Sequence, residues 1–151
     1  MSHTYARLHY HIVFSTKERK TFIKADLKDQ LHGYMIGIIN NIGGIVEEIN
    51  GTDDHVHILA YCPPKVALAD FVGKIKSNSS GWIHETWPER AMFGWQRGYG
   101  AFTVSESNVI AVKRYIQNQE EHHGRMTFRE ELKLLVEKHG LEFYDDDWSQ
   151  E

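Results

Sequence analysis

The feature of this sequence that most constrains its fold is a pair of strand-like runs joined by a tight turn. Residues 45–49 and 55–62 are rich in apolar and β-branched side chains, and the segment between them, Asn50-Gly51-Thr52-Asp53, is a strong turn signal. Pro63-Pro64 ends the second run, because proline cannot donate a hydrogen bond to a neighbouring strand. We therefore expect an antiparallel hairpin near the middle of the chain.

The second strand of this hairpin carries two histidines on one face. Side chains alternate between the faces of a strand, so His55 and His57 point one way and Val56 and Ile58 point the other way, into a core. Two imidazoles on one face can supply two ligands of a metal site, which then needs a third from elsewhere. The alternative, a sheet face that happens to hold two polar histidines, stays open at this point.

The remaining elements place the hairpin in a larger sheet. In chain order they are a strand at residues 5–15, a helix at 24–41, a helix that begins near residue 68 and closes at Trp87-Pro88, and a strand at 99–104. The order β-α-β-β-α-β is the split βαβ, ferredoxin-like (RRM-like) arrangement, an α+β fold with an antiparallel sheet and helices on one face. The first and third strands are central in this topology, so His9 and His11 lie beside the histidine strand.

Two helices are expected after the fourth strand. The first covers about residues 107–123, begins at hydroxyl caps in Ser105 and Ser107, and can lie across the open face of the sheet. A capping box from Thr127 to Glu130 opens an appended last helix, which an acidic tail follows, over residues 127–151. The sequence contains no repeat or linker that divides it, so we expect one domain over residues 1–151.

Composition excludes several classes of protein. A chain of 151 residues with 41% hydrophobic and 25% charged side chains is typical of one soluble globular domain. Cys62 is the only cysteine, so an internal disulfide and a cysteine metal cluster are excluded, and a cytoplasmic location is expected. The net charge is −4, but residues 1–141 carry 17 basic and 16 acidic side chains, so charge decides neither for nor against a nucleic-acid partner.

Two polar residues on the expected helix at 107–123 are candidates for chemistry. Tyr115 and Gln119 are four residues apart and project from one face of a helix. A glutamine carbonyl can bind a metal, and a tyrosine hydroxyl beside a metal can act as a nucleophile. A boundary tyrosine and a solvent-facing glutamine are the structural alternatives. His122 and His123 fall at the end of the helix, where its dipole favours cationic imidazoles, and a capping role is expected for them.

Taken together, these segments resemble the single-tyrosine HUH transposases, the TnpA-type transposases of insertion sequences. The matching pieces are His55-Val56-His57 after an acidic turn, the run from Val112 to His123, the run from His9 to Lys17, Lys76-Ser77 through Ser80, and the run from Trp95 to Phe102. They occur in the family's order over about residues 5–145. Each is weak alone, and together they are specific.

The resemblance implies a role for each matching residue. His55, His57 and Gln119 would bind a divalent ion, Mg²⁺ or Mn²⁺, while Tyr115 would attack a DNA phosphodiester to give a 5′-phosphotyrosine and a free 3′-OH. Such an ion offsets charge on the scissile phosphate. The resemblance also implies a homodimer, in which the tyrosine helix can be donated to the partner's histidines, and recognition of single-stranded DNA hairpins.

Side chains that would contact DNA are predicted less directly. A hairpin-binding protein needs basic and aromatic groups, and the candidates are Arg7, Lys17, Arg19, Lys20, Lys74, Lys76 and Arg97. Lys74 and Lys76 lie off the apolar stripe of their helix and are expected to be exposed. Asp54 can orient the imidazole of His55, although turn formation explains it equally well.

Three functions are compatible with the sequence. The first is a DNA transposase that cuts and rejoins single strands. The second is a host-retained nuclease of repetitive palindromes, which would use the same residues. The third is a nucleic-acid-binding module that does not cut, which would have no need for the set His55, His57, Tyr115 and Gln119.

Overall fold

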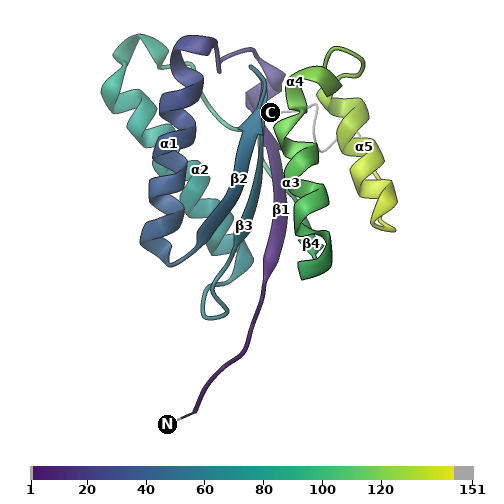
Figure 1. Cartoon of the computed structure of the whole chain (residues 1–151). Helices are drawn as coiled ribbons and strands as arrows, with labels where there is room; N and C mark the ends of the chain where they lie inside the picture. Colours follow the sequence, from purple (N-terminus) through teal and green to yellow (C-terminus); the bar gives the residue numbers. More distant parts are fainter. Residues whose placement is uncertain (1, 145–151) are drawn as a thin grey trace.

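The computed structural model describes residues 2–144 and contains one four-stranded antiparallel sheet with helices on both of its faces (Figure 1). The strands are β1 (His9–Ser15), β2 (Ile45–Gly51), β3 (His55–Tyr61) and β4 (Gly100–Val104). The α-helices are α1 (Ala25–Ile42), α2 (Leu68–Thr86), α3 (Val109–Gln117), α4 (Gln119–His122) and α5 (Phe128–Lys138). The short 3₁₀ helices are η1 (Lys17–Arg19), η2 (Pro88–Arg90) and η3 (Glu106–Asn108).

The strand order confirms the predicted topology. The sheet runs β2-β3-β1-β4, so the first and third strands are central. Helices α1 and α2 cover one face, and α3, α4 and α5 lie on the other (Figure 1). The fold is therefore the expected ferredoxin-like arrangement, with the tyrosine-bearing helix and an appended helix added on the second face.

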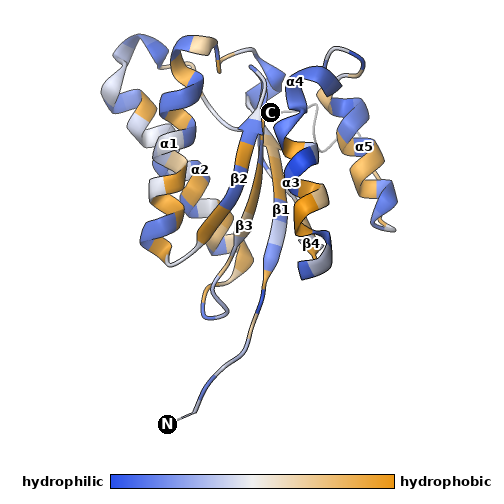
Figure 2. Ribbon diagram, viewed as in Figure 1, coloured by the Kyte–Doolittle hydropathy of each residue, from blue (hydrophilic) through white to orange (hydrophobic). Residues whose placement is uncertain are grey.

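The main core lies between the sheet and the helices α1 and α2. It is built from the faces of β1 and β3 opposite the histidines, including Ile12, Phe14, Val56 and Ile58, all of them fully buried. Figure 2 shows hydrophobic residues along the strands, and hydrophobic and hydrophilic residues interleaved around the helices. The other face carries two smaller apolar clusters, one around Val13 and one around Leu59.

Local sequence signals explain where several elements end. Helix α1 stops at Gly43, whose φ of 97° is left-handed and favours glycine. The capping box of α5 forms as predicted, since Thr127 and Glu130 each accept a hydrogen bond from the other's backbone N–H.

Two predicted boundaries are wrong. The first strand begins at His9, four residues later than expected, because its pairing with β3 and β4 starts at that residue. The carbonyl of Leu8 still accepts a hydrogen bond from Cys62 N. The helix expected over 107–123 is broken at Asn118 into α3 and α4, and neither Ser105 nor Ser107 caps it, since their hydroxyls bond each other.

The acidic residues 145–151 lie outside the described residues. Among the helices of residues 2–144, none combines the length and hydrophobicity that crossing a membrane requires.

Candidate active site

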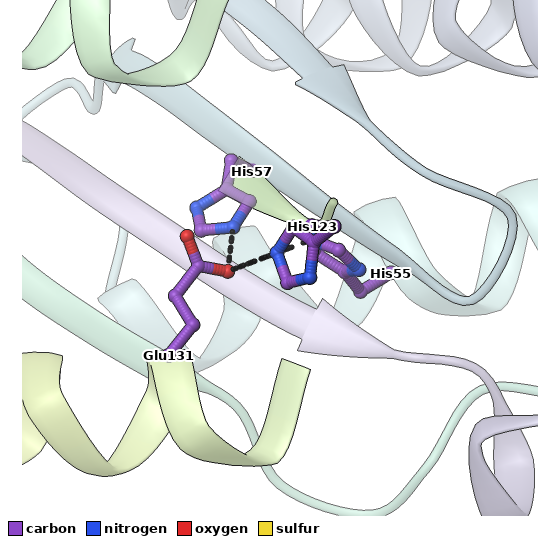
Figure 3. A group of neighbouring side chains, drawn as sticks. All are labelled: His55, His57, His123 and Glu131. Atoms are coloured by element: carbon purple, nitrogen blue, oxygen red, sulfur yellow. Dashed lines mark hydrogen bonds and ion pairs between the residues drawn. The ribbon is translucent and has the colours of Figure 1, made fainter. Parts of the chain in front are cut away.

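The two histidines of β3 are completely buried under the second helical layer. His55 and His57 have no exposed surface, and their ring centroids are 5.1 Å apart. The side chains of His123 and Glu131 reach the same point from after α4 and from α5 (Figure 3). The period-two prediction that both imidazoles share one face is confirmed.

Each histidine of the pair is held at its Nδ1 by a neighbour. The Nδ1 atom of His55 lies 2.7 Å from Oδ1 of Asp54, and that of His57 lies 2.7 Å from Nε2 of His11. Burial works to raise the pKa of Asp54, but hydrogen bonds with His55 and Thr52 hold it below its usual value. The Nε2 atoms of both rings are left to point into the cluster.

Burial keeps the ring of His57 neutral, which is the form that binds metal. Loss of hydration lowers the pKa of His57 to about 4, even though Glu131 works against the shift. The same cause, together with His57 itself, lowers the pKa of His11 to about 3. Sequence reasoning placed His11 beside the histidine strand but gave it no role.

Gln119 and Tyr115 converge on the pair from the broken helix. Oε1 of Gln119, a fully buried residue, is 3.0 Å from Nε2 of His55. The hydroxyl of Tyr115 donates a hydrogen bond to Glu131. Burial, and next the negative charge of Glu131, raises the pKa of Tyr115 above its usual value, so the phenol is neutral in this arrangement.

Glu131 is the centre of the cluster, and the sequence analysis missed it. Its side chain is 1% exposed, and Oε1 lies 3.0 Å from Nε2 of His57 and 3.6 Å from Nε2 of His55. Burial opposes its ionisation, but hydrogen bonds from His123, His57 and Tyr115 hold its pKa well below the usual range. The available signal was an acid within the inward-facing stripe of α5, between Phe128 and Leu132.

His123 has a different environment from the one predicted. It was expected to interact with a helix dipole, but its Nε2 lies 2.8 Å from Oε1 of Glu131. Burial lowers the pKa of His123, yet Glu131 outweighs that effect and raises it above the usual value. His122 instead packs its ring against Tyr115, with centroids 4.7 Å apart.

The cluster has the chemistry of a metal site. Ligand atoms of His55, His57, His123 and Glu131 all lie within 4.8 Å of one another. A cation about 2.1 Å from each ligand holds opposite ligands about 4.2 Å apart and adjacent ligands closer, so these atoms must draw together to bind one ion. Imidazole nitrogen and carboxylate oxygen are both common ligands of divalent transition ions.

The predicted DNA-contact residues divide into separate groups. Lys17 and Arg19 belong to η1, and Lys20 directly follows it. The loop that carries Arg97 lies beside η1, since the carbonyl of Gly94 accepts a hydrogen bond from Lys17 N. Lys76 is half-buried, so its predicted exposure is wrong: its ammonium group donates to the carbonyls of Gln96 and Gly98.

The other two candidates lie apart from that loop. Lys74 is exposed on α2, as expected. Arg7 pairs with Glu106 at 2.9 Å before the start of β1. Five of the seven candidates therefore gather near one loop, and two do not.

An open cleft of about 760 Å³ reaches the cluster from one side. It is lined by His123 of the cluster, by Asp54, and by the basic side chains of Lys24, Lys28 and Arg125. The cleft gives a path from solvent toward the buried histidines.

Comparison with known proteins finds a matching family model and related transposases. The sequence model of the family described as "Transposase IS200 like" matches residues 4–119. The ISDra2 transposase TnpA of Deinococcus radiodurans is 28% identical over 118 residues, which cover 75% of this chain and 84% of that protein. The transposase for insertion sequence element IS200 of Salmonella typhimurium is 28% identical over 124 residues, covering 79% and 81%.

Two solved structures share the fold. A putative transposase from Deinococcus radiodurans matches with a TM-score of 0.64 and 26% identity, over 79% of this chain and 96% of the other. The structure of a REP-associated tyrosine transposase bound to a REP hairpin matches with a TM-score of 0.62 and 14% identity, over 100% and 91%.

Proposed function

The chain belongs to the IS200-like transposase family, and from that premise we propose that it cuts and rejoins single-stranded DNA through a covalent bond to Tyr115. The observation that carries the proposal is that Tyr115 and His57 share one buried carboxylate, that of Glu131. A nucleophile and a set of metal ligands are thereby assembled within a single chain. A module that only binds nucleic acid has no use for this arrangement.

His55, His57 and Gln119 would hold a divalent cation, Mg²⁺ or Mn²⁺. When bound, such an ion supplies positive charge that offsets the charge building on the oxygens of the scissile phosphate. Asp54 and His11 fix the orientation of the two imidazoles, which keeps both Nε2 atoms directed inward.

The proposed reaction conserves the phosphodiester bond. The Tyr115 oxygen bonds to phosphorus while the bond from phosphorus to the 3′ oxygen breaks. One proton leaves the phenol and one joins the 3′ oxygen, so the products are a 5′-phosphotyrosine and a free 3′-OH. Attack by a 3′-OH on this linkage reverses the step, and the same site can therefore join strands.

We propose hairpin DNA as the substrate and the cytoplasm as the location. A protein of the same fold is bound to a hairpin, which supports a folded single strand as the ligand. The proposed contacts to the DNA backbone are Lys17 and Arg19 in η1, Lys20 directly after it, and Arg97 in the neighbouring loop. The homodimer implied by the family resemblance also remains a proposal.

The test is a search for the covalent adduct. Protein is mixed with labelled single-stranded hairpin DNA from the flanks of its own gene, with Mn²⁺ or with EDTA, and resolved on a denaturing gel. We expect a metal-dependent, protease-sensitive DNA adduct. Tyr115→Phe should abolish it and leave hairpin binding unchanged, because only one hydroxyl is removed.

The matched control is Tyr5→Phe, since Tyr5 is 93% exposed and lies before the start of β1. This variant should form the adduct at the wild-type level. An adduct that persists in Tyr115→Phe would assign the nucleophile to another residue. Binding without an adduct in the wild type would favour the module that does not cut.

A further inference from the structure

The surroundings of His55 bring several candidate metal ligands to one place. Nδ1 of His55 faces the carboxylate of Asp54, an acceptor, so this nitrogen carries the ring proton. Nε2 of His55 faces Oε1 of Gln119 at 3.0 Å and Oε1 of Glu131 at 3.6 Å.

The orientation of Gln119 is fixed by its other end. Its Nε2 donates to Oε2 of Glu131 at 3.0 Å, so its oxygen must be the atom that points to His55. The imidazole of His55 and the side-chain oxygens of Gln119 and Glu131 therefore meet inside the protein. Groups of these types bind divalent cations.

The two oxygens of Glu131 are divided between two tasks. Oε1 faces the Nε2 atoms of His55 and His57, and His123 holds it from another side at 2.8 Å. Oε2 accepts hydrogen bonds from Tyr115 and Gln119. A buried carboxylate is thus the shared partner of both candidate metal ligands and the candidate nucleophile.

We propose that Glu131 is itself a ligand of the cation, through Oε1, and that its Oε2 positions the Tyr115 hydroxyl beside the metal. The inference rests on the proposed function and adds a charged ligand to the set His55, His57 and Gln119. Glu131 belongs to α5, beyond residues 4–119 where the family model matches. The appended helix is then part of the active site, and its role extends beyond packing.

The test measures metal affinity without DNA. Mn²⁺ is titrated into metal-free protein and followed by calorimetry and by the loss of the free-ion electron paramagnetic resonance signal. Glu131→Gln keeps the side chain's size and removes its charge. We expect Mn²⁺ to bind at least about tenfold more weakly to this variant, because ligand charge contributes strongly to affinity.

Glu137→Gln is the matched control, since it makes the same change on an exposed position of the same helix. It should bind Mn²⁺ as the wild type does. Circular dichroism and thermal unfolding in EDTA establish that each variant is folded. Unchanged or tighter Mn²⁺ binding by folded Glu131→Gln would overturn the inference.

A second measurement needs no variant. In wild-type crystals grown with Mn²⁺, the anomalous signal locates the ion relative to each side chain. We expect it within about 2.3 Å of a Glu131 oxygen. An ion bound by His55 and His57 with the Glu131 carboxylate outside its coordination shell would contradict the proposal.

The two proposals fail in different ways. If the wild type binds Mn²⁺ through Glu131 but forms no adduct with DNA, the ligand assignment holds and the proposed cleavage fails. If the adduct forms and Glu131→Gln binds Mn²⁺ normally, the cleavage holds and the ligand assignment fails.

Discussion

His32 is a buried histidine outside the active site, and it should make the fold sensitive to acid. It lies on the inner side of α1, is 8% exposed, and its Nε2 has no hydrogen-bond partner among the described residues. Burial, and next the positive charge of Lys28, lower the pKa of His32 to about 4, while Asp29 opposes the shift. The folded state therefore resists protonation of this ring more than the unfolded state does.

The sign of the effect follows from linkage. The unfolded ring takes up a proton near pH 6.5, so the stability contributed by neutral His32 is complete above that value and is lost as pH falls toward 4. Between pH 7 and pH 5 the loss is about 2 kcal/mol, at about 1.4 kcal/mol per pKa unit. His32→Leu should remove this component of the pH dependence.

Urea unfolding of both proteins at pH 7 and pH 5 measures the difference. His3→Leu, at an exposed position, is the control and should keep the wild-type dependence. An equal loss of stability in the wild type and in His32→Leu would show that the buried ring does not carry the effect.

Among single residues, the sequence identified those site residues whose direction depends on their own helix or strand. His55 and His57 share a face because strands have a period of two. Glu131 and His123 were missed because their approach to β3 depends on how α5 packs across the sheet. No spacing within the sequence encodes that contact, which joins residues 57 and 131.

At the scale of elements, the hairpin before His55 depends on a glycine. A Cβ atom at Gly51 would overlap the carbonyl oxygen of His55, which is backbone and cannot rotate away. Gly51→Ala should therefore destabilise the protein by about 1–3 kcal/mol, as overpacking does. It should also weaken Mn²⁺ binding, because the displaced strand carries the first histidine.

Gly33→Ala is the informative comparison. Gly33 lies in the middle of α1, where an added Cβ meets no atom within 4 Å. Alanine favours helix by up to about 1 kcal/mol over glycine, so this variant should be more stable. Equilibrium unfolding of the two variants should give shifts of opposite sign, and a neutral Gly51→Ala would mean that the turn can rearrange at little cost.

The break between α3 and α4 depends on a contact that the apolar periodicity of the helix cannot predict. The side-chain amide of Asn50, in β2, donates to the carbonyls of Ile116 and Gln117 at 2.9 and 3.1 Å. These groups lie at the end of α3, so the contact helps to end that helix and start a new one at Gln119. The apolar periodicity predicted a helix here correctly, but the interruption comes from a strand 66 residues away.

At the scale of the molecule, the two faces of the sheet have different tasks. One apolar cluster extends over the face covered by α1 and α2. On the other face, the polar cluster separates two smaller apolar groups, one with Phe102 and Phe128 and one with Val104 and Ile116. The element order predicted this division, because a ferredoxin-like sheet leaves one face open for added helices. The fold thus places its main apolar core on one face and the cluster of polar side chains on the other.

This arrangement makes a prediction about whether the site is built from one chain or two. Tyr115 meets Glu131, and Glu131 meets His57, all within a single chain. If the proposed reaction uses this geometry, each chain supplies its own nucleophile. Mixing His57→Ala with Tyr115→Phe should then give no DNA adduct, because neither chain holds both groups. Co-refolding the two variants before the denaturing-gel assay ensures that mixed dimers can form. If the tyrosine helix is instead donated to the partner, half of the randomly paired dimers are mixed, and each mixed dimer has one complete site out of two. An adduct at about a quarter of the wild-type level would therefore show that the site is shared between two chains.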